Sequence, residues 1–138
     1  MNVRKIDIND YSIVNLLEQF KGDPLKISKD QFEDFISKLH DNHLIMVIEN
    51  NQEIICCGTI IIETKLMHNM GKVGHIEDII THSSYRGQGL GKKIINSLVS
   101  YAKKCGCYKV ILDCSIINIP FYQKCGFEQR ENQMALYF

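Results

Sequence analysis

The sequence lacks an excess of charge of either sign, and it lacks any long hydrophobic run. Its 138 residues include 16 Lys and Arg against 16 Asp and Glu, so the formal net charge is zero. A protein that reads nucleic acid is expected to show a basic bias, and this chain shows none. The longest apolar stretch, residues 54–62, is too short to cross a bilayer as a helix. Neither nucleic acid nor a membrane is therefore an expected partner.

Signals for secretion and for metal binding are also missing. The first ten residues, MNVRKIDIND, contain no apolar run of signal-peptide length, so we expect a soluble, cytoplasmic protein. Among the six cysteines, Cys105 and Cys107 form a C-x-C pair, but no second pair and no H-x-x-x-H stands at zinc spacing. We therefore expect no metal, and we expect reduced thiols that act as small apolar side chains.

No internal repeat, low-complexity tract or linker divides the chain, whose length is that of one domain. We expect a single domain over residues 1–138. Alternation of apolar and polar residues predicts strands, whereas apolar residues three and four apart predict helices. Ser28 and Gln31 form an S-x-x-Q capping box that opens one of these helices. The predicted strands are 3–8, 44–48, 53–65, 74–81, 108–114 and 127–138, and the predicted helices follow residues 10 and 28 and span 90–105 and 118–124.

The order of these elements predicts an α/β fold with a mixed sheet. Residues 44–65 read as an antiparallel hairpin around a turn at 50–52. Strand 74–81, the following loop and helix, and strand 108–114 form a β-α-β unit, whose two strands are expected to be parallel. The sheet therefore combines antiparallel strands at the front with one parallel pair.

The loop between strand 74–81 and helix 90–105 carries the clearest chemical signal. Glycines allow positive φ and a close approach of the backbone to a ligand. Free N–H groups in the first turn of a helix, together with the helix dipole, favour an anion. We therefore predict a phosphate or pyrophosphate site formed by Arg86, Gly87, Gln88, Gly89, Leu90, Gly91 and Lys92.

Known phosphate loops of other kinds fit less well. A Walker A loop needs Gly at position 86 and Ser or Thr at position 93, where this chain has Arg and Lys. The dinucleotide fingerprint is G-x-G-x-x-G, whereas the spacing here is G-x-G-x-G. A flexible surface turn without a ligand is the remaining alternative.

Residues 86–91 match [QR]-x-x-G-x-[GA], and in this the chain resembles the GNAT superfamily of acetyltransferases, whose loop binds the pyrophosphate of acetyl-CoA. The segments GHIEDI at 74–79, GCYK at 106–109 and FYQKCGF at 121–127 narrow the resemblance to the glucosamine 6-phosphate N-acetyltransferase family. The resemblance covers the C-terminal two-thirds and is weaker before residue 54. It implies the GNAT fold, a central mixed sheet with splayed strands flanked by helices.

The same resemblance implies a reaction. The acetyl group of acetyl-CoA would pass directly, in a ternary complex, to the amine of glucosamine 6-phosphate. The product, N-acetylglucosamine 6-phosphate, would serve UDP-N-acetylglucosamine synthesis. By resemblance, backbone groups of Ile79, Ile80 and Thr81 meet the acetyl-pantetheine arm. Besides the glycine-rich loop, the remaining expected contacts with acetyl-CoA are Asn118, Tyr122, Gln123 and Lys124.

The transfer needs a proton acceptor and a proton donor. Glu77 and Asp78 are candidates to accept the amine proton or orient the amine, and either can instead be a structural carboxylate. An ideal strand would place them on opposite faces, but the family has a bulge here that alters this geometry. Tyr122, a phenol that is a donor near neutral pH, is the candidate to protonate the leaving sulfur; its alternative role is a core aromatic.

The family forms a homodimer whose active sites are shared between chains. By resemblance, the sugar phosphate contacts Glu77, Asp78 and Ile79, while Tyr108 and Lys109 come from the partner. The remaining expected sugar-phosphate contacts are Lys65, Leu66, Met67, His68 and Glu131. The family's C-terminal Arg is missing, since Tyr137 stands at its place, so Lys21 or Lys26 is the candidate to replace the lost charge.

Two other functions fit parts of the pattern. A GNAT enzyme can act on a different amine, such as a protein or a polyamine. A noncatalytic acyl-CoA-binding regulator would keep the loop without turnover, although the presence of both Glu77 and Tyr122 speaks against that function.

Overall fold

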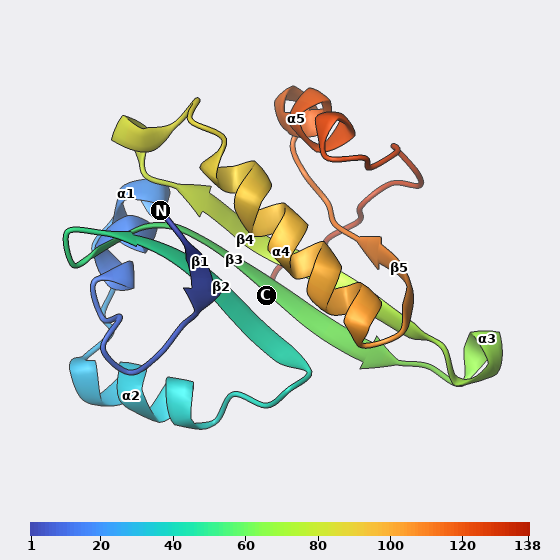
Figure 1. The fold of residues 1–138 in the computed structure, drawn as a ribbon, viewed down its shortest axis with the longest axis horizontal. Helices are drawn as coiled ribbons and strands as arrows, with labels where there is room; N and C mark the ends of the chain where they lie inside the picture. The colour runs from blue at the N-terminus through green and yellow to red at the C-terminus, as the bar shows by residue number, and fades with distance from the viewer.

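The computed structural model describes all of residues 1–138, arranged around one five-stranded sheet (Figure 1). The strands lie in the order β1-β2-β3-β4-β5, and only the β4–β5 pair is parallel. This confirms the predicted mixed sheet with a β-α-β crossover. The strands are β1 (Val3–Lys5), β2 (His43–Asn50), β3 (Glu53–Thr64), β4 (Lys72–Thr81) and β5 (Cys107–Ile111), and the helices are α1 (Ile13–Lys21), α2 (Lys29–Ser37), the short turn α3 (Met67–Met70), α4 (Leu90–Lys104) and α5 (Ile119–Lys124).

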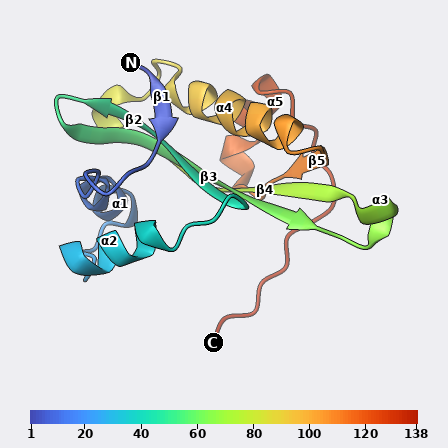
Figure 2. The same ribbon diagram turned by 60° about the horizontal axis from the view of Figure 1, so that its bottom comes forward.

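Helices cover both faces of the sheet (Figure 2). On one face lies α4, whose apolar stripe is fully buried against β2, β3 and β4. On the other face lie α1 and α2, and the predicted Ser28–Gln31 capping box opens α2 with both reciprocal hydrogen bonds. No helix is both long and apolar enough to pass through a membrane. The buried stripe of α4 consists of Leu90, Ile94, Ile95, Leu98 and Ala102.

The parallel strands β4 and β5 separate part of the way along their length. They pair from Lys72 with Cys107 to His75 with Ile111, where β5 ends. Strand β4 continues to Thr81, so residues 76–81 have β3 on one side and no strand on the other. The sheet is therefore open at this point, as expected from splayed strands, and the open edge leads directly to the loop before α4.

A bulge interrupts β4 within this open part. Thr59 pairs with Glu77 and Cys57 pairs with Ile80, so the single residue Gly58 faces two residues of β4. One of those two, Asp78, has φ = 53°, a left-handed conformation that Asp adopts more readily than most residues. The bulge expected at this strand is thus present.

The predicted last strand, 127–138, is wrong. Residues after α5 form no helix or strand, and in Figure 2 this tail leaves the body of the molecule. Met134, Leu136 and Tyr137 are 94%, 80% and 90% exposed. A strand needs a hydrogen-bonding neighbour, and no segment of the same chain pairs with the tail, although the outer edge of β5 is open.

Candidate functional site

The loop before α4 has the backbone geometry that an anion site requires. Gly87 and Gly89 have φ values of 77° and 78°, which side-chain-bearing residues rarely adopt. Gly89 is the residue that precedes α4, and no side chain caps the helix. The first N–H groups of a 15-residue helix are therefore left for an outside acceptor.

The charges around this loop also favour an anion. The first turn of α4 contains no acidic residue, and it carries the exposed Lys92 and Lys93. Cations at the positive end of a helix dipole are repelled by it, and a bound anion offsets this repulsion. Arg86 donates from Nε to the Thr81 carbonyl at 3.3 Å, which holds its guanidinium at the end of β4. The residues present fit a diphosphate.

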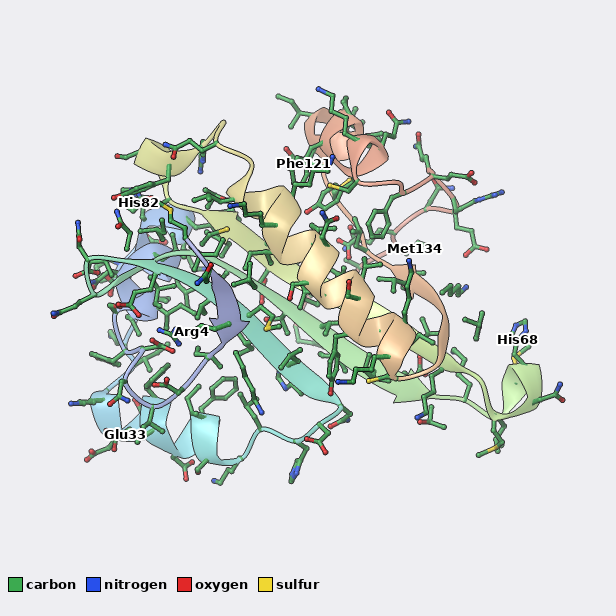
Figure 3. All side chains as sticks on the ribbon, viewed as in Figure 1. Arg4, Glu33, His68, His82, Phe121 and Met134 are labelled. Atoms are coloured by element: carbon green, nitrogen blue, oxygen red, sulfur yellow. The ribbon has the colours of Figure 1, made fainter.

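Helix α5 packs against the start of α4 and brings Tyr122 to the same region. A Cβ placed on Gly91 would lie 3.2 Å from the Phe121 ring and 3.6 Å from Thr81 Oγ1, so the loop, the end of β4 and α5 meet closely. Figure 3 shows Phe121 beside the first turn of α4. The ring of Tyr122 makes edge contacts with those of Phe121 and Phe127 at 4.9 and 6.1 Å between centroids.

Burial raises the pKa of Tyr122 to about 12, and the neighbouring Cys114, Cys125 and Asp113 add to the rise. The phenol therefore keeps its proton throughout the neutral range and remains a hydrogen-bond donor. Its side chain is half-buried against the core, which also agrees with the alternative role as a packing aromatic. The position of Tyr122 is compatible with both the donor role and the packing role, and a measurement of turnover distinguishes them.

The bulge places two successive carboxylates at the open edge. Glu77 and Asp78 are both exposed, although neighbouring residues of a regular strand face opposite sides. Partial burial raises the pKa of Glu77, the charges of Asp113 and Asp78 raise it further, and His75 opposes them. A carboxylate with a raised pKa is a better proton acceptor near neutral pH.

The structure adds Asp113, which the sequence pattern did not single out. Its charge raises the pKa of both Glu77 and Tyr122, so it lies near both groups. Asp113 is the second residue after β5, just beyond the carboxyl end of a parallel strand that borders the opening. Ligands of open α/β sheets commonly bind at such strand ends. This rule was the one signal in the sequence that could have identified Asp113.

The other expected contacts with acetyl-CoA border the same opening. Ile79, Ile80 and Thr81 form the last part of β4, beyond the point where β5 ends. Asn118 stands at the start of α5, where its amide donates to Ser115 Oγ at 3.1 Å, and Gln123 and Lys124 are exposed on the same helix. The structure thus brings these residues together around one opening.

The expected sugar-phosphate residues form a separate cluster. His68 and Tyr108 stack with 4.4 Å between ring centroids, and Lys109 Nζ lies 5.7 Å from the centre of the Tyr108 ring. Figure 3 shows His68 at the far tip of the β3–β4 hairpin, away from Phe121. Next to this tip, Glu63 accepts from His75 at 2.9 Å and from Lys65 at 3.3 Å, and these bonds lower the pKa of Glu63.

The tip itself has an uncommon backbone. His68, Asn69 and Met70 have φ values of 55°, 56° and 63°, three left-handed non-glycine residues in succession. The Lys65 N–H closes the turn by donating to the Gly71 carbonyl at 2.8 Å, and the turn exposes Leu66 and Met67. The segment between the predicted strands 53–65 and 74–81 therefore contains a defined turn.

The two clusters of one chain are separated along β4. Tyr108 lies beside Lys72 and Val73 in the β4–β5 register, four to five residues from Glu77. At about 3.3 Å per residue this is roughly 15 Å, longer than a sugar monophosphate. Glu131 lies on the exposed tail, and no hydrogen bond or ion pair joins it to either cluster.

Comparison with known proteins agrees with this architecture. The protein named Glucosamine 6-phosphate N-acetyltransferase from Arabidopsis thaliana is 41% identical over 142 residues, which cover 99% of this chain and 95% of the relative. Glucosamine 6-phosphate N-acetyltransferase 1 from Dictyostelium discoideum is 40% identical, with 99% and 90% covered. Both alignments span almost the whole length of each protein.

Solved structures agree as well. The crystal structure of the Arabidopsis thaliana glucosamine-6-phosphate N-acetyltransferase superimposes with a TM-score of 0.93 at 39% identity, covering 99% of this chain and 97% of that one. A predicted acetyltransferase from Clostridium acetobutylicum, solved with acetyl-CoA, gives a TM-score of 0.74 at 25% identity, with 99% and 95% covered. The Acetyltransferase (GNAT) family matches residues 11–127. With its anion loop, its splayed strands and these relatives, the chain belongs to the GNAT family of acetyltransferases.

Proposed function

We propose that the protein transfers the acetyl group of acetyl-CoA to the amine of glucosamine 6-phosphate, by direct transfer in a ternary complex. The observation that carries this proposal is the open edge of β4, which runs from Glu77 to the anion loop at α4. A linear molecule with a diphosphate at one end and a thioester at the other fits this path. The names of the relatives support the choice of sugar phosphate.

Each group at the edge has a role in this proposal. The N–H groups of the first turn of α4, with Arg86 and Lys92, hold the diphosphate of acetyl-CoA. The free backbone of residues 79–81 pairs with its amide arm. Glu77 Oε accepts the amine proton, directly or through water, so that the amine attacks in its neutral form. The Tyr122 hydroxyl donates to the departing sulfur. The Asp113 charge raises the pKa of Glu77, which makes it a stronger base, and the pKa of Tyr122, which keeps the phenol protonated.

The site is completed by a second copy of the chain. Tyr108 and Lys109 of the partner subunit meet the sugar phosphate beside Glu77, since the chain's own pair lies roughly 15 Å away by strand rise. The exposed tail, which ends in Leu136, Tyr137 and Phe138, supplies apolar area for such an interface. Sedimentation equilibrium is expected to give a dimer, and a strictly monomeric active enzyme would contradict the shared site.

Replacing Tyr122 with Phe tests the proton donor. We expect kcat to fall about 10- to 100-fold, the range of one hydrogen bond to a charged group, while the affinity for coenzyme A stays within about twofold. Phe keeps the ring contacts with Phe121 and Phe127, so packing is preserved. Steady-state kinetics with calorimetry of coenzyme A binding measure both quantities. Unchanged turnover would leave Tyr122 only its packing role.

A second pair of variants tests how the sugar phosphate is held without a C-terminal Arg. Lys21 ends α1 and Lys26 follows in the α1–α2 connection, both exposed and without an ion pair. We expect Lys21→Ala or Lys26→Ala to raise the KM for the sugar phosphate about three- to tenfold, because a charge-assisted contact is lost. Lys38→Ala is the control, since Lys38 is paired with Asp34 at 2.8 Å on α2. If neither variant changes KM, neither lysine holds the phosphate.

The experiment that tests the function follows the release of free thiol from acetyl-CoA. The protein is given amino sugars, amino sugar phosphates, polyamines and peptides in parallel. Release with glucosamine 6-phosphate well above that with the others is the expected result. Thiol release only with peptides or polyamines would show that the substrate is a different amine. Coenzyme binding without any thiol release would identify a noncatalytic regulator.

A further inference from the structure

The bulge in β4 depends on the strand beside it. Two residues of β4 face Gly58 of β3, so the ladder is interrupted at Asp78 and Ile79. A left-handed Asp costs backbone energy and persists only where its surroundings hold it. Cys57, the residue before Gly58, donates its thiol hydrogen to the Asp78 carbonyl at 3.8 Å. A side chain of β3 thus reaches the backbone of the bulge.

The surroundings of Cys57 keep this contact in place. Cys57 is 3% exposed and belongs to the cluster that includes Val47 and Ile80. Burial raises the pKa of its thiol to about 12, with the charges of Cys56 and Asp78 adding to the rise, so the sulfur keeps its hydrogen. The thiol therefore reaches the Asp78 carbonyl from a fully buried position.

Cys57 differs in this from the cysteine beside it. Cys56 points to the other face of the sheet, toward α4, and its sulfur meets Thr81 Oγ1 at 3.2 Å. No hydrogen bond joins its sulfur to the bulge. Two adjacent buried thiols therefore serve different parts of β4, and only that of Cys57 meets the residue with the left-handed conformation.

We propose that Cys57 is a positioning residue, whose thiol holds the Asp78 backbone in its left-handed conformation and so sets the direction of the Glu77 and Asp78 carboxylates. The catalytic part of this inference rests on the proposed acetyl transfer, and the structural part does not. Because the contact lies next to Glu77 and away from the loop that holds the diphosphate, it acts on turnover more than on coenzyme binding.

Three variants test the inference. Cys57→Ala removes the thiol, Cys57→Ser keeps a donor of similar size, and Val47→Ala opens the same buried cluster directly opposite Cys57 without touching the bulge. We expect Cys57→Ala to lower kcat roughly two- to fivefold, the range of one weak hydrogen bond, with a smaller change in the affinity for coenzyme A. Cys57→Ser is expected to recover at least half of the lost turnover. Val47→Ala is expected to lower Tm at least as much as Cys57→Ala and to keep kcat.

A readout without turnover separates this inference from the proposed function. Amide chemical shifts recorded without substrate are expected to change at Asp78, Ile79 and Ile80 in Cys57→Ala, and to change less there in Val47→Ala. Equal changes in the two variants, or a Cys57→Ser enzyme no better than Cys57→Ala, overturn the positioning role. If the wild-type protein transfers no acetyl group, the proposed function fails, and the amide shifts still decide whether the thiol holds the bulge.

Discussion

Glu77→Gln is expected to lower kcat roughly 100- to 10,000-fold, the usual contribution of a positioned general base. The amide keeps the size and the hydrogen-bonding reach of the carboxylate, but it cannot take a proton from the amine. Glu33→Gln is the matched control, because Glu33 is a half-buried carboxylate on α2, far from the opening (Figure 3). A variant with wild-type turnover would show that Glu77 only orients the sugar.

The pH dependence of the wild-type enzyme should report the ionisation of Glu77. Only ionised Glu77 accepts a proton, so log(kcat/KM) is expected to rise with pH through the pKa of Glu77. Burial and the charge of Asp113 raise that pKa above the ordinary value of 4.5, so the rise is displaced upward in pH. Glu77→Gln should remove this limb of the profile. A raised carboxyl pKa means that folding disfavours the ionised form, so at neutral pH the variant should be at least as stable as the wild type.

Gly58→Ala is expected to destabilise the fold by about 1–3 kcal/mol, the range for overpacking a filled core. Its Cβ would stand 2.4 Å from Ile79 Cδ1 and 2.5 Å from Ile94 Cγ2. Ile79 belongs to the bulge and Ile94 to the buried stripe of α4, so the added methyl pushes apart the two elements that border the opening. Urea denaturation measures the loss, and turnover is expected to fall with it.

A double variant checks the reason for this loss. Ile79→Val removes the Cδ1 atom that the new methyl would touch, so Gly58→Ala with Ile79→Val should be more stable than the sum of the single effects predicts. The interaction with Ile94 remains, and recovery is expected to be partial. Strict additivity would mean that the cost of Gly58→Ala arises elsewhere, for example from the unfolded chain.

Local patterns were sufficient to predict much of the fold. The stripe of α4 repeats every three to four residues, the α2 cap is encoded by Ser28 and Gln31, and the glycines of the loop mark its positive φ values. Each of these depends on residues close together in the sequence. The residues expected around acetyl-CoA lie around one opening, but their contacts with ligands stay predictions.

Other features depend on parts of the chain that lie far apart. Residues 127–138 have the composition of a strand, but their partner is missing from the same chain, and composition does not reveal a missing partner. The bulge was expected through family resemblance and not through the alternation of residues, because Glu77 and Asp78 read as an ordinary strand interior. Asp113 was missed because only the early end of β5 places it at the opening.

The early end of β5 also decides what kind of molecule the protein can take up. An unpaired strand edge usually attracts any extended polypeptide, and proteins shield such edges against aggregation. Here the bare edge begins where β5 ends, and it leads to the loop before α4, against which α5 packs. A slender chain of amide groups can bind along this edge through main-chain atoms, while the Ile79 and Ile80 side chains pack against the core on the two faces of the sheet.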